Sequence, residues 1–363
     1  MTKQLDFPNG QIHKDLLLEE TDKGLATVLN EHPEIKTLWE RRQLYPKPLT
    51  INGVNPVLHV MIEGIIENQL QDLTGVQEIY TKLQQEENLT PHAARACIAN
   101  VFIHEFFKVL AEKTPFDEES FIRRLSLIGT DISSLGRNDR CPCGSGAKFK
   151  RCCSSYADAF MVSPLAGRID LGHGSYFFET PNSGDPLDPI FQLEARYQIA
   201  MYMDEQEDLD GAVKVLKENI AQAESYDGGT FLANAWQDYM SFCQNYRQLT
   251  GEFVEASDHL LAMTSDEEKR ATIIYDKADY FAQNGDMKAA EAEYTSLFSS
   301  MPNNYHSRYR FALMLSRHDR YADAIKVLTD LLKMKDIDDQ TQEDALFLLE
   351  TLGEDTTDFN PLF

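Results

Sequence analysis

Four of the six cysteines of this chain lie within thirteen residues, at Cys141, Cys143, Cys152 and Cys153. The spacing is Cys-x-Cys followed, after eight residues, by an adjacent Cys-Cys pair. Four thiols held this close together suit a tetrahedral Cys₄ metal site, and Zn²⁺ fits it better than iron. Because the cysteines fill all four positions, no position stays open for a substrate, which is typical of a structural site.

The residues between these cysteines support the same interpretation. Pro142 stiffens the turn between the first two thiols, and Gly144 and Gly146 allow amide groups to approach sulfur. A group of basic residues surrounds the cysteines and is opposed only by Asp139. We call this group the basic patch: Arg137, Arg140, Lys148, Lys150 and Arg151. It can compensate the charge of the thiolates, and it can also dock on an acidic partner.

Other uses of these thiols are less consistent with the sequence. A disulfide between adjacent Cys152 and Cys153 would be strained. Catalytic redox chemistry is disfavoured because there is no Cys-x-x-Cys pair. The segment Gly144–Lys148 lacks the complete spacing of a phosphate-binding loop. A redox or metal sensor that releases its metal on oxidation stays an open alternative.

The stretch from Gly136 to Cys153 resembles the SEC-C motif, named for the C-terminal tail of the SecA preprotein-translocase ATPase. The likeness rests on Gly-Arg-Asn-Asp, Cys-Pro-Cys-Gly-Ser-Gly, the alternating lysines and the final Cys-Cys. Arg140 stands where proline is usual. The resemblance implies that the four cysteines are metal ligands and that the module docks on proteins, in SecA the acidic chaperone SecB and the ribosome. Translocase activity is not implied, because no ATPase motor is present.

The overall charge narrows the class of partner. A net charge of −25 argues against general DNA binding and against an anionic membrane surface. The first residues form no signal peptide, and no apolar run approaches the roughly 20 residues of a membrane helix. We therefore expect a cytoplasmic protein. Cys97 and Cys243 lie among apolar neighbours and are expected to be core residues.

Residues 1–135 predict an all-helical domain. Its expected helices cover 11–45 with a break near Pro33, 55–70, 74–86, 91–113 and 117–128. Gly64 lowers the helix propensity of its segment, so we expect a close approach of another helix there. The stretch from Asn55 to Gln69, with its Asn-Pro-x-Leu-His start, resembles an uncharacterised family of small bacterial helical proteins over about residues 33–113. That resemblance implies a fold and no activity.

Two histidines of this domain lie on apolar helix faces, each with a glutamate nearby. His59 has Glu63 one turn later, and Glu105 follows His104. A second metal site between the helices is one interpretation, and an enzyme with its catalytic centre there is the function it would imply. Hydrogen-bonded core histidines are the other interpretation, which we prefer.

Residues 136–157 form the expected cysteine knuckle, and 158–190 an expected connector with a short hairpin. From 191 to 363 the chain repeats. Ala278 and Ala312 are 34 residues apart, as are Ala290 and Ala324. This spacing and the Gly-Asp turn of the first copy resemble tetratricopeptide repeats, with a capping helix at 340–352. The resemblance implies stacked helix pairs that form an α-solenoid.

Three tyrosines occupy the same position in three of the repeats: Tyr197, Tyr275 and Tyr309. A tyrosine ladder facing a peptide groove is one interpretation, and packing between neighbouring repeats is the other. The sequence as a whole predicts a mostly α protein with an N-terminal helical domain, a Cys₄ knuckle and a helical solenoid. We expect a non-enzymatic adaptor, with one partner at the groove and a ribosome or acidic chaperone at the basic patch.

Overall fold

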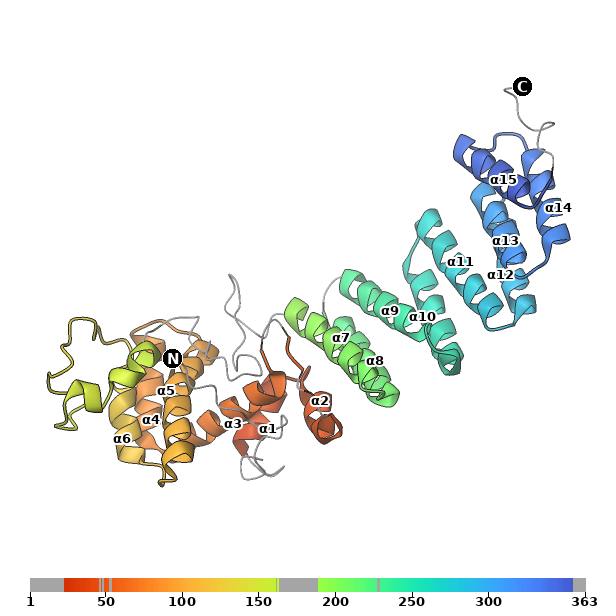
Figure 1. The fold of residues 1–363 in the computed structure, drawn as a ribbon. Helices are drawn as coiled ribbons and strands as arrows, with labels where there is room; N and C mark the ends of the chain where they lie inside the picture. Colours follow the sequence, from red (N-terminus) through yellow and green to blue (C-terminus); the bar gives the residue numbers. More distant parts are fainter. Residues whose placement is uncertain are drawn as a thin grey trace. The chain divides into compact units, whose positions relative to one another are not determined.

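The computed structural model describes residues 23–45, 47, 49–51, 54–160, 162, 189–226 and 229–354. These residues are mostly helical and form isolated β-bridges but no β-strand, which confirms the predicted fold class (Figure 1). The chain packs as two compact units that divide between Asn219 and Ile220, within one helix. Among the described helices, none combines the length and the apolar character needed to cross a membrane.

Within the described residues, the first unit begins with two short helices and a 3₁₀ turn, and four further helices follow. Their bounds are α1 Lys23–Glu31, α2 Lys36–Arg41, η3 Arg42–Leu44, α3 Pro56–Asp72, α4 Thr74–Gln85, α5 Pro91–Glu112 and α6 Glu118–Leu125. The predicted break near Pro33 is confirmed, and residues 11–22 of that expected helix lie outside the described part. The helices start where the sequence indicates, because Asn55 and Thr90 cap α3 and α5 through their side-chain oxygens. A proline follows each cap at the first helical position.

Helix α1 crosses α3 at the predicted close approach. A Cβ atom on Gly24 would lie only 2.4 Å from the carbonyl oxygen of Gly64. The backbone amide of Gly24 donates to Asn68 Oδ1 at 3.0 Å. This contact needs glycine at position 24, and it holds the N-terminal end of α1 against the middle of α3.

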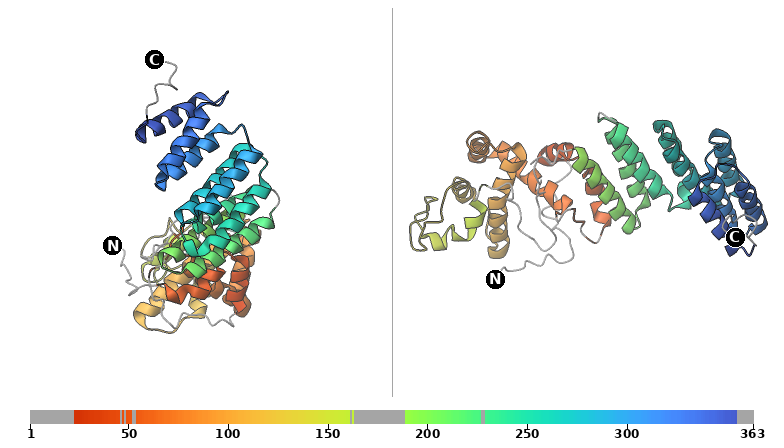
Figure 2. Two further views of the ribbon diagram at one scale, coloured as in Figure 1. Left: turned by 90° about the vertical axis from the view of Figure 1, so that its right-hand side faces the viewer. Right: turned by 90° about the horizontal axis from the view of Figure 1, so that it is seen from above.

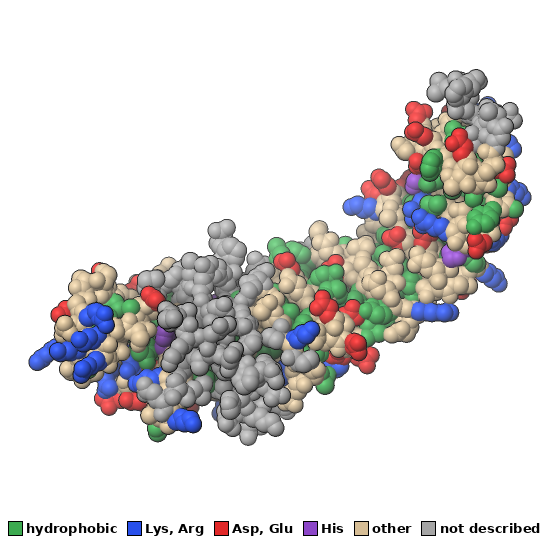
Figure 3. Space-filling view, viewed as in Figure 1, with side chains coloured by type: hydrophobic (Ala, Val, Ile, Leu, Met, Phe, Trp, Pro, Cys, Tyr) green, Lys and Arg blue, Asp and Glu red, His purple; other side chains and the backbone are tan. Residues whose placement is uncertain are grey.

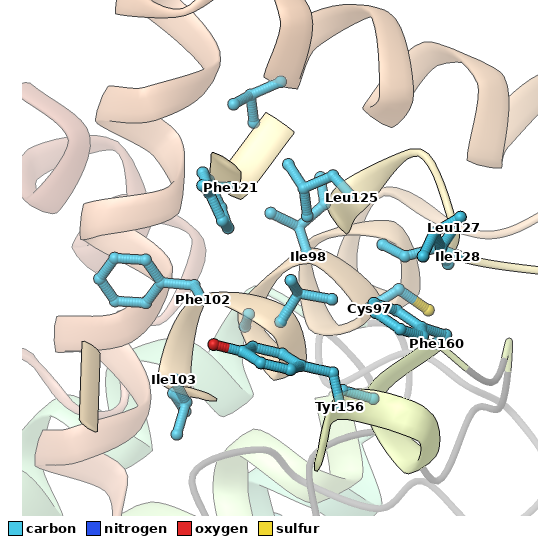
Figure 4. Close-up of a cluster of buried hydrophobic side chains, with 14 of the residues drawn as sticks. Cys97, Ile98, Phe102, Ile103, Phe121, Leu125, Leu127, Ile128, Tyr156 and Phe160 are labelled. Atoms are coloured by element: carbon cyan, nitrogen blue, oxygen red, sulfur yellow. The ribbon is translucent and has the colours of Figure 1, made fainter. Parts of the chain in front are cut away.

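The cysteine knuckle packs on the same unit through two 3₁₀ helices, η4 Phe149–Arg151 and η5 Ser154–Phe160. Figure 4 shows Phe102 of α5 and Phe121 of α6 in one buried cluster with Tyr156 and Phe160 of η5. Cys97 belongs to this core, as predicted. The knuckle is therefore built into the helical unit rather than suspended from it.

Helices α7 Pro189–Glu205 and α8 Leu209–Glu224 follow, and the residues of α8 up to Asn219 belong to the first unit. Asp208, between them, accepts hydrogen bonds from Arg41 and Tyr45, and its Oδ1 accepts from the amide of Gly211 at 3.1 Å. The repeat region predicted from residue 191 is thus divided between the two units, because this polar contact ties its first helix pair to α2.

The second unit is a succession of antiparallel helix pairs, best followed in Figure 2. Its helices are α9 Gly229–Cys243, η6 Arg247–Leu249, α10 Thr250–Met263, α11 Glu267–Gln283, α12 Met287–Ser300, α13 Tyr305–Arg317, α14 Tyr321–Leu332 and α15 Asp339–Thr351. The alanines spaced by 34 residues, Ala278, Ala290, Ala312 and Ala324, are all fully buried. Small residues at these positions let the helices of a pair approach closely.

The packing of the second unit agrees with helical repeats, whereas membership of the tetratricopeptide family stays a prediction. Helix α15 covers the predicted capping segment. The predicted hairpin around residues 168–178 lies outside the described residues.

Candidate metal centre

A short loop brings the four cysteines together. Arg140 and Lys148 form an antiparallel bridge, and the amide of Cys141 donates to the carbonyl oxygen of Ala147 at 2.8 Å. Gly144 and Gly146 take φ values of +76° and +72°, in the left-handed region that a side chain rarely tolerates. These two glycines let the chain reverse within the loop, so that the first thiol pair faces the second.

The sulfur atoms have the spacing of a tetrahedral ligand set. Cys143 Sγ lies 3.5 Å from Cys141 Sγ and 3.5 Å from Cys152 Sγ, and the adjacent Cys152 and Cys153 sulfurs are 3.6 Å apart. All four sulfurs lie within 4.8 Å of one another. A tetrahedron with Zn–S bonds of about 2.3 Å has edges of about 3.8 Å, so the arrangement fits that ion. The Cys152–Cys153 separation is much longer than a disulfide bond of about 2.05 Å.

The thiols differ in how readily they ionise, and burial raises the pKa of Cys141. Burial raises the pKa of Cys143, but hydrogen bonds from the side chain and backbone of Ser145 outweigh it and bring the pKa to about 6. For Cys153, burial and the neighbouring thiols raise the pKa. A bound metal ion reverses that second effect, because it stabilises the thiolate form.

Comparison with known proteins agrees with this geometry. The family model of the SEC-C motif matches residues 137–155. These residues are a SEC-C motif. Together with the four converging thiols, the match indicates that the SEC-C motif of this chain is a metal-binding site, whose metal the comparison does not specify.

Two further comparisons found a second family and a curated relative. The model described as a domain of unknown function (DUF1841) matches residues 9–126, which confirms the resemblance of the N-terminal region to an uncharacterised family. The protein translocase subunit SecA of Albidiferax ferrireducens is 42% identical over 88 residues, which are 24% of this chain and 10% of that protein. The chain thus covers about a tenth of this curated relative's length. No solved structure matches the chain.

One side of the SEC-C motif packs on the core of the helical unit. Cys153 is fully buried, and Phe149 of η4 is 7% exposed, both within the core of the helical unit. Tyr156 stacks under the guanidinium of Arg124, which lies 4.7 Å from the ring centre and forms an ion pair with Glu105 of α5. Residues of α5 and α6 therefore support the loop that carries the metal site.

The basic patch faces the solvent. Each of its five side chains belongs to an exposed residue, and Figure 3 shows a group of basic side chains at the end of the unit that carries the SEC-C motif. Asp139, the one acidic residue beside them, accepts a hydrogen bond from the amide of Gly136 at 2.8 Å. Part of its charge is thus used within the turn, and the patch keeps a positive character.

The structure does not bring together all four residues that were considered for a second metal site in the N-terminal domain. His59 and Glu63 lie together as expected, but Glu105 pairs with Arg124, and the ring of His104 packs 5.2 Å from that of Tyr156. Burial lowers the pKa of His104. The prediction that His104 and Glu105 share a site with His59 is therefore wrong, because they face the SEC-C motif instead.

Two other histidines lie beside His59 and Glu63, and no sequence pattern described above indicates either of them. They are His32, which follows α1, and His92, in the first turn of α5. Their positions at helix ends could have indicated them as candidates. His32 precedes Pro33 at the predicted helix break, and His92 directly follows a predicted helix start.

The three repeat tyrosines differ in exposure. Tyr275 is 7% exposed, and its hydroxyl donates to Asn304 Oδ1 at 3.2 Å. Its ring lies 6.2 Å from that of Tyr294. Tyr275 thus packs within its own unit and is not available to a partner. Tyr197 and Tyr309 are half-buried, and their role in partner binding stays a prediction.

Proposed function

We propose that this protein is a non-enzymatic cytoplasmic adaptor whose SEC-C motif holds Zn²⁺ and presents the basic patch to a ribosome or an acidic chaperone. The observation that carries the proposal is the combination of a closed thiol site with five exposed basic residues around it. Four thiolate donors leave no position for a substrate, so the metal serves to shape the loop. The shaped loop then displays its charges on a fixed surface.

The similarity to SecA supports the choice of partner class, since SecA is a subunit of a protein translocase. The overall negative charge of the chain favours a contact that is confined to the basic patch. With a net charge of −25, the protein as a whole repels nucleic acid and acidic proteins, and the basic patch offers a local attraction. The contact we expect is therefore local and strongly dependent on salt.

The direct test is co-sedimentation of the full-length, zinc-loaded protein with bacterial ribosomes at low and at high salt. Replacing Lys148, Lys150 and Arg151 by glutamate should abolish binding. The matched control replaces three exposed lysines of the second unit, Lys326, Lys333 and Lys335, by glutamate, which changes the net charge by the same amount. Binding that survives the first triple variant, or that both variants lose equally, would contradict docking through the patch.

The acidic chaperone is tested in the same way, with SecB in place of the ribosome and binding measured by titration calorimetry. A ribosome-negative and SecB-positive result would select the chaperone version. Elemental analysis of the purified protein tests the metal. We expect the Cys141→Ser variant to hold about one zinc ion fewer per chain than the wild type, and iron in place of that zinc would contradict the choice of ion.

The second half of the proposal is that the helix pairs of the C-terminal unit bind another protein. Its support is the stacked-pair packing together with two exposed aromatic residues, Phe347 at 72% and Tyr321 at 49% exposure. Aromatic side chains exposed on a repeat surface are common anchors for a partner. Replacing both by alanine should abolish cross-linking to that partner and leave ribosome binding unchanged.

A further inference from the structure

Three histidines and one glutamate converge inside the N-terminal helical unit. We call them the histidine cluster: His32, His59, Glu63 and His92. Each offers one donor atom, and these atoms all lie within 4.8 Å of one another. The cluster is deeply placed, since His32, His59 and Glu63 are at most 1% exposed, and the His92 side chain is 12% exposed.

The fold brings these residues together from three segments. His59 and Glu63 stand one helical turn apart on α3 and so share a face. The crossing of α1 over α3 at Gly24 and Gly64 places His32 above that face. Helix α5 supplies His92 from its first turn.

The distances within the cluster are those between ligands of one small ion. His32 Nε2 lies 3.3 Å from His59 Nε2 and 3.3 Å from Glu63 Oε2. His59 Nε2 lies 3.8 Å from the same oxygen. In a tetrahedral zinc site with metal–nitrogen bonds of about 2.0–2.1 Å, the donors are about 3.3–3.4 Å apart. Three donor atoms therefore form nearly one face of such a tetrahedron.

One carboxylate oxygen of Glu63 faces the imidazoles of His32 and His59 at 3.3 and 3.8 Å. Glu63 Oε2 is buried, yet within the described residues it has no hydrogen bond of acceptable geometry. The other oxygen is engaged, since Oε1 lies 2.8 Å from His92 Nδ1 and 3.4 Å from Arg95 Nε. A buried carboxylate oxygen without a donor costs stability, and a cation between it and the imidazoles would remove that cost.

The surroundings of His32 match those of a metal ligand. Its Nδ1 donates to Glu34 Oε1 at 2.9 Å, and Glu34 is 1% exposed. In metal sites a carboxylate in this position fixes the ring and leaves Nε2 free to bind the ion. Glu34 therefore orients His32, and its own position depends on the turn after α1.

The charges around the cluster also balance for a divalent ion. Two positive charges on the metal are matched by Glu63 and Glu34. The nearby guanidinium of Arg95 forms ion pairs with Glu31, Glu63 and Glu67, so the carboxylates around the cluster outnumber its one positive charge. A buried ion of this charge is thus compensated without any group from the solvent.

We propose that the histidine cluster is a second metal site, which binds a divalent transition-metal ion, Zn²⁺ in the first place. Three imidazoles and one carboxylate are the donors that zinc accepts, and they are unlike the all-oxygen sets of Mg²⁺ and Ca²⁺. With four protein ligands the site is closed, and it holds α1, α3 and α5 together. This proposal does not depend on the adaptor function, because it concerns different residues and a second bound ion.

The test uses the full-length protein with Cys141 and Cys143 both replaced by serine, which removes the metal of the SEC-C motif. After dialysis against Zn²⁺ and then against buffer, elemental analysis should find about one zinc per chain. Adding His59→Asn should abolish it. The matched control is His104→Asn, a histidine on the same helix as His92 that lies outside the cluster, and it should keep the zinc. A zinc-free cysteine variant, or zinc retained after His59→Asn, would overturn the proposal.

A second measurement covers the case in which His59→Asn does not fold. The cysteine variant is stripped with chelator, and its unfolding midpoint is measured with added Zn²⁺ and with added Mg²⁺. Zinc should raise the midpoint by at least about 3 °C, and magnesium should not. With Co²⁺ in place of zinc, absorption should show the visible bands of the ion without a thiolate charge-transfer band. No shift with zinc, or a thiolate band, would contradict the assignment.

Discussion

The guanidinium of Arg124 lies 4.7 Å from the centre of the Tyr156 ring and forms an ion pair with Glu105. Arg124 belongs to α6, Glu105 to α5 and Tyr156 to the 3₁₀ helix that follows the last cysteine. One side chain therefore joins the SEC-C motif to the helical unit. The relationship links the stability of the metal site to the packing of α5 and α6.

We predict that Arg124→Gln destabilises the first unit by about 3–5 kcal/mol, because it leaves the buried carboxylate of Glu105 without its partner. The control is the adjacent Arg123→Gln, which breaks an exposed pair with Glu119 and should cost no more than about 0.5 kcal/mol. The free energy of unfolding is measured in urea through the fluorescence of Trp39, in a Trp236→Phe background. Equal losses in the two variants would show that burial adds nothing to this ion pair.

Loss of one buried thiol should loosen the whole SEC-C motif. Cys153→Ser removes a ligand that is fully buried in the core, so the variant should bind one metal ion fewer per chain than the wild type. The loop should then become at least about tenfold more sensitive to trypsin at its lysines and arginines. Cys243→Ser, in the second unit, should change neither the metal content nor the rate of cleavage there. A variant at Cys153 that keeps its full metal content would rule out this cysteine as a ligand.

The contact between α1 and α3 should be intolerant of any side chain. We expect Gly24→Ala to cost about 1–3 kcal/mol, because the new methyl group would lie 2.4 Å from the carbonyl oxygen of Gly64. Gly251→Ala is the matched control, since nothing lies within 4 Å of its added Cβ, and it should be neutral or stabilising by up to about 1 kcal/mol. Thermal unfolding of the two variants compares them directly. A neutral Gly24→Ala would mean that the two helices can separate at no cost.

The contact of Asp208 with Arg41 should make stability depend on pH in the acid range. Burial raises the pKa of Asp208, but hydrogen bonds from Arg41 and Tyr45 outweigh it and hold the pKa below its ordinary value of 3.8. A carboxyl whose folded pKa is depressed contributes stability that is complete above its unfolded pKa and is lost as pH falls through its folded pKa. This contribution should therefore be full at pH 6, begin to fall below about pH 4, and be lost as pH passes below the depressed pKa of the folded state.

The variant that tests this is Asp208→Asn, which should lose about 1–3 kcal/mol at pH 6 and little at pH 2.5. Glu40→Gln serves as the control, because the pair of Glu40 with Lys214 is half exposed and contributes little at either pH. Urea unfolding at the two pH values gives the four free energies. A loss for Asp208→Asn that is the same at both pH values would contradict an electrostatic origin.

Features that depend on neighbouring residues could be predicted from the sequence. The four thiols converge because the bends at Gly144 and Gly146 lie between them, so the ligand geometry is decided within one loop. The starts of α3 and α5 were predictable for the same reason, since Asn55 and Thr90 act on amides only three residues away. In such cases the interacting groups lie close together in the sequence, so the rest of the fold has little influence on their contact.

The histidine cluster shows where such reasoning stops. His59 and Glu63 were predictable as a pair one turn apart, but His32 and His92 come from other helices. Their approach depends on how α1 crosses α3 and on how α5 packs beside them. His104 looked equivalent to His59 by its apolar surroundings, yet its face of α5 meets Tyr156. Periodicity indicates that a face is buried and does not indicate which element buries it.

The sequence by itself determined the helical fold class, the helix caps, the 34-residue repeat and the four converging thiols of the SEC-C motif, because each follows from local spacing and chemistry. Only the tertiary structure decided that the SEC-C motif rests on α5 and α6, that Tyr275 is buried, and that His32 and His92 join Glu63. The physical reason is that these contacts join residues far apart in the chain. Their energies depend on shape and charge complementarity between whole helices, which no local pattern contains.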